Sequence, residues 1–112
     1  MNIQIFGMRK CFDTQKTERY FKERNIKYQF IDLDQKSLSK GELNSIKQSI
    51  ILDDLINQKA KDYTRLNMNK IGKSSMREEI LLNNPQLFKT PVVRNGKLAS
   101  VGYQPEIWNE WC

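Results

Sequence analysis

The stretch IQIFGMRKCFDTQKTERYF, residues 3–21, joins an apolar run, a glycine, two cations and a single cysteine to the start of an amphipathic pattern. Residues 2–6 are typical of a short buried strand. From residue 13 to residue 24 the apolar spacing is i, i+3, i+4, which predicts a helix. The segment therefore predicts a strand, a loop and a helix, with Cys11 just before the helix.

A second strand is predicted in KYQFIDL, residues 27–33, which is rich in strand-forming side chains. Strand, helix and strand within residues 1–33 form a βαβ unit, whose strands should be parallel with a right-handed crossover. Cys11 then lies at the C-terminal end of the first strand. Ligands and catalytic groups of open α/β sheets gather at that edge.

The middle of the chain is polar, and its pattern is helical. Ser39 followed by Glu42, and Ser75 followed by Glu78, have the spacing of a capping box, which predicts two helix starts. Residues 50–66 carry apolar side chains at helix spacing. We read this block as a helical insertion rather than a separate domain.

The last part of the chain changes character. In TPVVRNGKLASVGY, residues 90–103, two short strand-like runs flank Asn95-Gly96, the strongest local signal for a two-residue type I′ hairpin. Residues 104–111 then predict a short helix with a proline in its first turn. Trp108 and Trp111 are expected to pack that helix onto the sheet, and binding of a partner is the alternative.

The order of elements predicts an α/β protein with a mixed four-stranded sheet flanked by helices. Its length, 112 residues, favours a single domain. Within 1–112 we distinguish a βαβ unit at 1–36, a helical insertion at 37–84, and a β-hairpin with a C-terminal helix at 85–112. The pattern does not specify the order of the strands.

Composition narrows the class of protein. Apolar residues make up 38% and charged residues 29%, as in a globular domain. No apolar run approaches the roughly 20 residues of a membrane helix, and the N-terminus resembles a strand rather than a signal peptide, so we expect a cytoplasmic protein. The net charge of +6 suits an anionic ligand or partner. The lysines are scattered, so we do not expect direct nucleic-acid binding.

Histidine is absent, which excludes Cys-His and Ser-His-Asp catalysis and the common zinc sites. The two cysteines, Cys11 and Cys112, are far apart and form no metal-binding pattern, so we expect no metal. Chemistry must use cysteine, carboxylate, lysine, arginine or the backbone. Cys112 is either a resolving thiol or, as we favour, an exposed chain-end residue.

Cys11 has surroundings that favour a thiolate. The helix start offers its dipole and free N–H groups, and Arg9 and Lys10 add positive charge. Asp13 opposes ionisation. The alternative is a small buried apolar side chain. The Thr90-Pro91 pair lies before a strand, where a cis bond is plausible, but spacing alone favours an ordinary trans proline.

Three blocks together resemble the arsenate reductase/Spx family: FGMRKCFDTQKTERYFKERNIKYQFIDL, NPQLFKTPVV and VGYQPEIW. The likeness runs through nearly the whole chain. It implies a thioredoxin-like fold with a helical insertion. It also implies that Cys11 is the nucleophile and that Pro91 is a cis-proline packed near it.

The chain departs from this family at two places. Spx-type regulators commonly carry CxxC, and here Thr14 takes the second position; its hydroxyl could bind the thiolate but cannot resolve a mixed disulfide. Arsenate reductases of this family grip the oxyanion with arginines. Thr90 stands where one of them precedes the proline, and only Arg65 offers a loose match to another. Dedicated arsenate reduction is therefore the least favoured reading.

The leading hypothesis is a thiol-dependent oxidoreductase related to the arsenate reductases. The Cys11 thiolate would attack an oxidised sulfur or an oxyanion, and an external thiol such as glutathione, or a redoxin, would release the adduct. No bound cofactor is expected. The alternative is a Spx-like regulator that binds the C-terminal domain of the RNA polymerase α-subunit without turnover. The residues expected to stabilise the thiolate or hold the substrate are Arg9, Lys10, Thr14, Arg65, Thr90 and Pro91.

Overall fold

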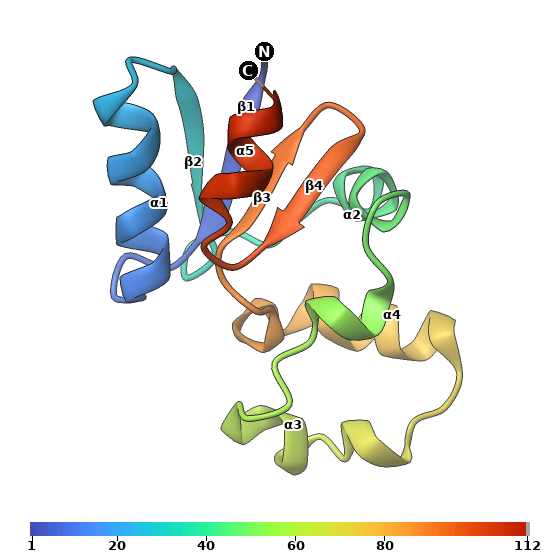
Figure 1. Cartoon of the computed structure of the whole chain (residues 1–112). Helices are drawn as coiled ribbons and strands as arrows, with labels where there is room; N and C mark the ends of the chain where they lie inside the picture. The colour runs from blue at the N-terminus through green and yellow to red at the C-terminus, as the bar shows by residue number, and fades with distance from the viewer. Residues whose placement is uncertain (112) are drawn as a thin grey trace.

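A computed structural model describes residues 1–111 and contains the predicted βαβ unit (Figure 1). Strand β1 (Ile3–Gly7), helix α1 (Phe12–Glu23) and strand β2 (Tyr28–Asp32) follow one another, and the two strands are parallel. Helix α1 stops because Asn25 adopts a left-handed conformation with φ 56°. The sequence therefore predicted this unit correctly.

The middle of the chain is helical but is divided into short pieces. They are α2 (Lys40–Lys47), η1 (Leu52–Leu55), α3 (Lys61–Arg65), η2 (Met68–Lys70), α4 (Ser74–Asn83) and η3 (Pro85–Leu87). The capping box of Ser39 and Glu42 is confirmed at the start of α2. The second predicted capping box is wrong. Helix α4 begins at Ser74 without a side-chain cap, and Glu78 instead pairs with Lys47 of α2 at 2.7 Å.

The helical pattern over residues 50–66 does not form one helix. Ile56 pairs with Phe88 in an isolated antiparallel bridge. On either side of it, the N–H of Asn57 donates to Leu87 O at 2.7 Å and the N–H of Lys89 donates to Leu55 O at 2.8 Å. These long-range backbone bonds replace helical ones, so the segment is held against the chain that leads into the third strand.

The hairpin is present, but its turn lies one residue later than predicted. Strand β3 (Val92–Asn95) and strand β4 (Leu98–Val101) pair with Asn95 opposite Leu98, which leaves Gly96 and Lys97 as the turn. Of these two, only Gly96 has a positive φ, of 62°. A type I′ turn needs a positive φ at both central residues, whereas type II′ needs it only at the first. The type I′ prediction is therefore wrong.

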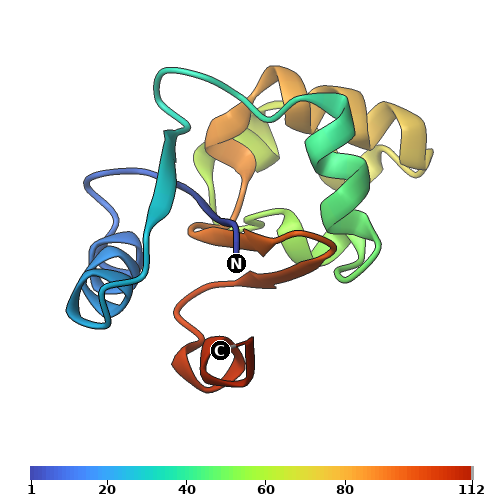
Figure 2. The same cartoon turned by 90° about the horizontal axis from the view of Figure 1, so that it is seen from above.

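The four strands form one mixed sheet in the order β2-β1-β3-β4, with β3 antiparallel to both β1 and β4. Helix α1 and the last helix, α5 (Pro105–Trp111), cover one face, and the helical insertion lies on the other (Figure 2). The expected mixed sheet flanked by helices is thus confirmed.

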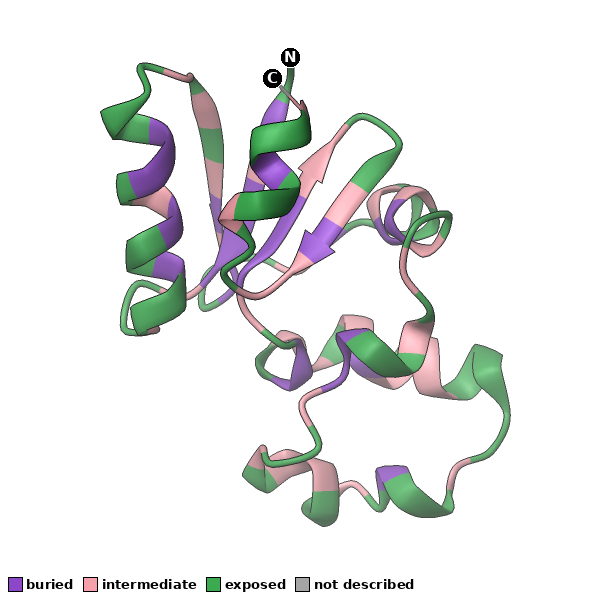
Figure 3. Cartoon of the chain, in the orientation of Figure 1, coloured by how far each residue is buried: buried purple, intermediate pink, exposed green. Residues whose placement is uncertain are grey.

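Two apolar cores follow from this layering (Figure 3). On the face covered by α1 and α5, Trp108, Tyr20 and Phe21 pack with side chains of β1 and β3. The Trp108 Nε1–H also donates to Ser100 Oγ at 2.8 Å. The core toward the helical insertion contains Phe6, Ile31, Leu33, Leu38, Leu43, Ile46, Leu55, Ile56, Met68, Leu81, Leu87, Phe88 and Val92. Within residues 1–111, no helix is long and apolar enough to cross a membrane.

Candidate functional site

Cys11 is the residue that caps the N-terminus of α1. Its N–H donates to Met8 O at 3.0 Å, and its carbonyl accepts the N–H of Gln15 at 3.0 Å. Both backbone groups are therefore occupied, and the half-buried side chain lies at the positive end of the helix. This position brings free N–H groups of the first helical turn toward the sulfur.

Thr90, which lies two residues before β3, contacts this sulfur with its side chain. Its hydroxyl donates to Cys11 Sγ at 3.2 Å, and Sγ lies 3.7 Å from the carbonyl oxygen of Thr90. The hydroxyl can donate a hydrogen bond to a thiolate, whereas the carbonyl oxygen can accept one only from a protonated thiol. The Thr90–Pro91 bond is cis, as the family resemblance implied, and Pro91 O accepts the N–H of Gly102 at 2.8 Å.

Thr14 lies on the inner side of the sulfur. It is fully buried, and its hydroxyl has no hydrogen-bond partner among residues 1–111. A Cβ placed on Gly7 would approach Thr14 Cγ2 to 2.6 Å and Oγ1 to 2.7 Å. Thr14 therefore occupies the space that the missing side chain of Gly7 leaves, and its unsatisfied hydroxyl gains an acceptor when Cys11 ionises.

The pKa of Cys11 reflects two opposing effects. Burial raises the pKa of this thiol. The hydroxyls of Thr90 and Thr14, together with backbone N–H groups of Thr14 and Asp13, lower the pKa by more because they stabilise the thiolate. The net pKa of Cys11 lies below its ordinary value because these donors favour the charged form.

The cations that precede the cysteine have other partners or none. Arg9 Nε lies 3.7 Å from Asp32 Oδ2, and its guanidinium lies 4.6 Å from the centre of the Phe30 ring, so it leans toward β2. Lys10 is exposed. Hydrogen-bond donors lower the pKa of Cys11. A role of Arg9 and Lys10 toward a substrate stays a prediction.

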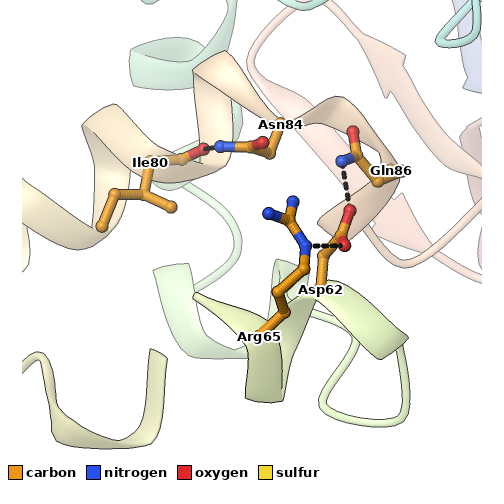
Figure 4. Close-up of polar contacts among 5 residues, drawn as sticks. All are labelled: Asp62, Arg65, Ile80, Asn84 and Gln86. Atoms are coloured by element: carbon orange, nitrogen blue, oxygen red, sulfur yellow. Dashed lines mark hydrogen bonds and ion pairs between the residues drawn. The ribbon is translucent and has the colours of Figure 1, made fainter. Parts of the chain in front are cut away.

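Arg65 is held within the helical insertion (Figure 4). Its Nε donates to Asp62 Oδ1 at 2.7 Å, and Asp62 also accepts a hydrogen bond from Gln86. Arg65 does not line the cavity at Cys11. The structure therefore brings Thr14 and Thr90 to the cysteine, with Pro91 next to Thr90 in the chain, but does not bring Arg65 there.

The sulfur opens onto a cavity of about 850 Å³ between the sheet edge and the helical insertion. Its lining includes Cys11, Asp13, Asp53, Asp54, Asn57, Gln58, Lys59, Lys89, Thr90, Val101 and Gly102. Sequence reasoning missed the residues contributed by 53–59. The only local signal was the polar run NQK, residues 57–59, inside an otherwise helical pattern.

No metal-binding cluster is found in the part of the chain that the structure describes. Cys112, which we considered as a second thiol, lies outside the described residues. Cys11 is free. The chemical capacity of the site therefore resides in one thiol, its hydroxyl and N–H donors, and a polar cavity of mixed charge.

A four-stranded mixed sheet with a cysteine at the start of its first helix defines a thioredoxin-like protein. Residues 6–111 match the ArsC family, so the chain belongs to that family. It is 26% identical to the global transcriptional regulator Spx 2 of Oceanobacillus iheyensis over 110 residues, covering 95% of this chain and 80% of that protein.

Two solved structures illustrate the fold. The arsenate reductase from Vibrio cholerae superposes with a TM-score of 0.85 at 24% identity, covering 98% of this chain and 97% of that one. The NrdH-redoxin from Escherichia coli matches with a TM-score of 0.51 at 17% identity, covering 100% and 96%. The family resemblance and the thioredoxin-like fold are thus confirmed, and the protein is arsenate reductase-like or Spx-like.

Proposed function

We propose that this protein is a thiol-dependent reductase that uses Cys11 as its single nucleophile. The observation that carries the proposal is the environment of the Cys11 sulfur. It accepts a hydrogen bond from Thr90, has a lowered pKa, and opens onto a large cavity. A thiolate with those properties is both a better populated nucleophile and a better leaving group than an ordinary thiol.

The reaction is a thiol–disulfide exchange in two steps. The Cys11 thiolate attacks one sulfur of a disulfide, a Cys11–substrate disulfide forms, and the other sulfur leaves as a thiolate. An external thiolate, such as that of glutathione or a redoxin, then attacks the substrate sulfur, forms a disulfide with it and returns Cys11 as a thiolate. A second molecule of the external thiol reduces that disulfide and is itself released as a disulfide with the first. Thr90 and Thr14 donate hydrogen bonds to the sulfur at the beginning and at the end of this cycle.

The test is turnover of 2-hydroxyethyl disulfide with glutathione as reductant. Cys11→Ser should abolish turnover, and Cys112→Ser should leave most of it. The rate of Cys11 alkylation against pH, measured in a Cys112→Ser background, should show a midpoint below that of a free thiol. Turnover that survives in Cys11→Ser, or a thiol that titrates at its ordinary pKa, would overturn the proposal.

The second candidate is a regulator that binds a protein without turnover. Its support is the similarity to the transcriptional regulator Spx 2 along 95% of this chain. The partner that the family resemblance implies is the C-terminal domain of the RNA polymerase α-subunit. Pull-down with that domain, in reducing and in oxidising buffer, tests this function. Failure to bind in both buffers would eliminate it.

Dedicated arsenate reduction receives less support from the site. The cavity at Cys11 contains no arginine and carries three carboxylates, of Asp13, Asp53 and Asp54. Bidentate guanidinium groups are the usual means of holding a tetrahedral oxyanion. We therefore expect arsenate to be a poor substrate relative to 2-hydroxyethyl disulfide.

A further inference from the structure

A second concave surface lies beside the first, on the face of the sheet that α1 and α5 cover. We call it the α1 groove. It measures about 430 Å³ and is lined by Lys16, Arg19, Tyr20, Glu23, Arg24, Tyr103 and Pro105. It is therefore formed by α1 and the segment that leads from β4 into α5 (Figure 1).

The cations of the α1 groove are arranged over aromatic rings. Lys16 Nζ lies 5.7 Å from the centre of the Tyr103 ring, and Arg24 Cζ lies 3.7 Å from that of Tyr20. Lys16, Arg19 and Arg24 form no ion pair with any of residues 1–111. Their charges are therefore available to carboxylates from outside the chain.

The α1 groove and the Cys11 cavity are lined by consecutive residues of the chain. Gly102 lines the Cys11 cavity, and Tyr103, the next residue, lines the groove. Phe12 follows the cysteine directly, leaves 78% of its surface exposed, and lies one helical turn before Lys16. An exposed aromatic side chain and then a run of cations thus extend from the sulfur along α1. A ligand that touches both sites must be longer than a small disulfide.

The charge pattern favours a polypeptide over a nucleic acid. Glu23 interrupts the cations within the groove, and Glu106 and Glu110 are exposed on the neighbouring helix α5. A nucleic-acid backbone carries a charge on every phosphate and would meet these carboxylates. A peptide can place a few carboxylates opposite the cations and leave the acidic positions free.

We infer that the natural substrate of the Cys11 thiolate is a disulfide on a polypeptide whose neighbouring acidic residues lie in the α1 groove. This inference rests on the proposed reductase function and specifies the substrate class. Phe12 contacts the peptide beside its sulfur, while Lys16 and Arg19 attract its carboxylates. Thiol–disulfide exchange at Cys11 then proceeds as described above, with the peptide sulfur entering the mixed disulfide.

The experiment uses three short peptides that each carry one cysteine as its mixed disulfide with 5-thio-2-nitrobenzoate. They differ only in whether glutamate, glutamine or lysine flanks the cysteine. Stopped-flow absorbance of the released thiolate gives the rate of attack by Cys11 in the full-length Cys112→Ser protein. We expect the glutamate peptide to react about tenfold faster than the lysine peptide at low salt, with the difference shrinking at high salt.

Two double variants distinguish the effect of the groove cations on peptide preference from the effect of the protein's net charge. Lys16→Glu with Arg19→Glu should remove or reverse the preference for the glutamate peptide. Lys36→Glu with Lys70→Glu changes the net charge equally at exposed positions outside the groove and should preserve it. Both variants should react with 2-hydroxyethyl disulfide like the parent, which shows that they are folded and have an active thiol.

The outcomes distinguish this inference from the proposed function. If Cys11 reacts with 2-hydroxyethyl disulfide but the three peptides react equally, the substrate class is wrong and the reductase function stands. If Cys11 reacts with none of the disulfides, the reductase function itself fails. If oligothymidylate competes with the glutamate peptide as strongly as a glutamate peptide without cysteine does, the groove binds polyanions in general and the inference is overturned.

Discussion

Gly7→Ala is the substitution that best tests how the site is built. Gly7 ends β1, and its missing side chain leaves room for the buried Thr14 beside Cys11. An alanine Cβ at this position would lie 2.6 Å from Thr14 Cγ2 and 2.7 Å from Oγ1. Thr14 is β-branched and fully buried, so it has few rotamers with which to move away. We expect the start of α1 to shift, and Cys11 to shift with it.

The expected loss of stability in Gly7→Ala follows from two opposing contributions to the free energy of unfolding. Forcing a methyl group into a packed core costs about 1–3 kcal/mol. Gly7 does not have a positive φ, so alanine also restricts the unfolded chain, which stabilises by about 0.4–1 kcal/mol. The net loss should be about 1–2 kcal/mol. In a Thr14→Ala background both close contacts disappear, so the loss should fall below about 0.5 kcal/mol, a coupling of order 1 kcal/mol.

The assay is urea denaturation of the four proteins of this cycle, in reducing buffer at neutral pH, together with the rate of Cys11 alkylation. Gly7→Ala should lower the urea midpoint and slow alkylation. Gly7→Ala with Thr14→Ala should recover most of the stability relative to Thr14→Ala alone. A Gly7→Ala protein as stable as the parent, or a loss that is the same in both backgrounds, would refute the steric reasoning.

Three further predictions concern the sulfur and the core. Thr90→Val removes the hydroxyl donor at 3.2 Å, so the pKa of Cys11 should rise and the alkylation profile should move to higher pH; an unchanged midpoint would argue against this hydrogen bond. Because folding lowers the pKa of Cys11, ionisation of this thiol stabilises the fold at pH values above the pKa of the unfolded thiol. This stabilisation is lost as the pH falls through the pKa of the folded thiol. The difference in unfolding free energy between the parent and Cys11→Ala should therefore decrease as the pH is lowered. A difference that does not change with pH would contradict this link between ionisation and stability. Trp108→Phe breaks the 2.8 Å bond to Ser100 and leaves a small void, so calorimetry or urea denaturation should show a loss of about 2–3 kcal/mol, whereas a loss near zero would mean that the bond contributes little.

Local patterns predicted much of the fold. The βαβ unit, the capping box at Ser39 and the last helix all appear where the sequence placed them. The pattern misled where a long-range contact competed with it. Glu78 has the right spacing for a capping box with Ser75, yet its carboxylate pairs with Lys47 of another helix. Within residues 50–66, Ile56 likewise pairs with Phe88 in a β-bridge and does not continue a helix.

The candidate site shows the same division. The motif around Cys11 identified the thiol and its place at a helix start, because both depend on residues within one turn. The contact with Thr90 joins residues 79 apart in the chain. The local sequence suggested the helix start, Arg9 and Lys10 as the groups that favour a thiolate, and the structure adds the Thr90 hydroxyl as a donor to the sulfur. The five residues between 53 and 59 that line the cavity had only the polar run at 57–59 as a signal in the sequence.

The sequence by itself determined the class of elements, the place of Cys11 at a helix start and the family, since periodicity, capping and short motifs act over a few residues. Only the tertiary structure decided the strand order, the break in the central helical pattern and the partners of Cys11. It also placed Arg65 with Asp62, away from the Cys11 cavity, and put Gly102 in that cavity and Tyr103 in the α1 groove. These features depend on which backbone and side-chain groups meet across the sheet, and such meetings are set by the packing of the whole chain.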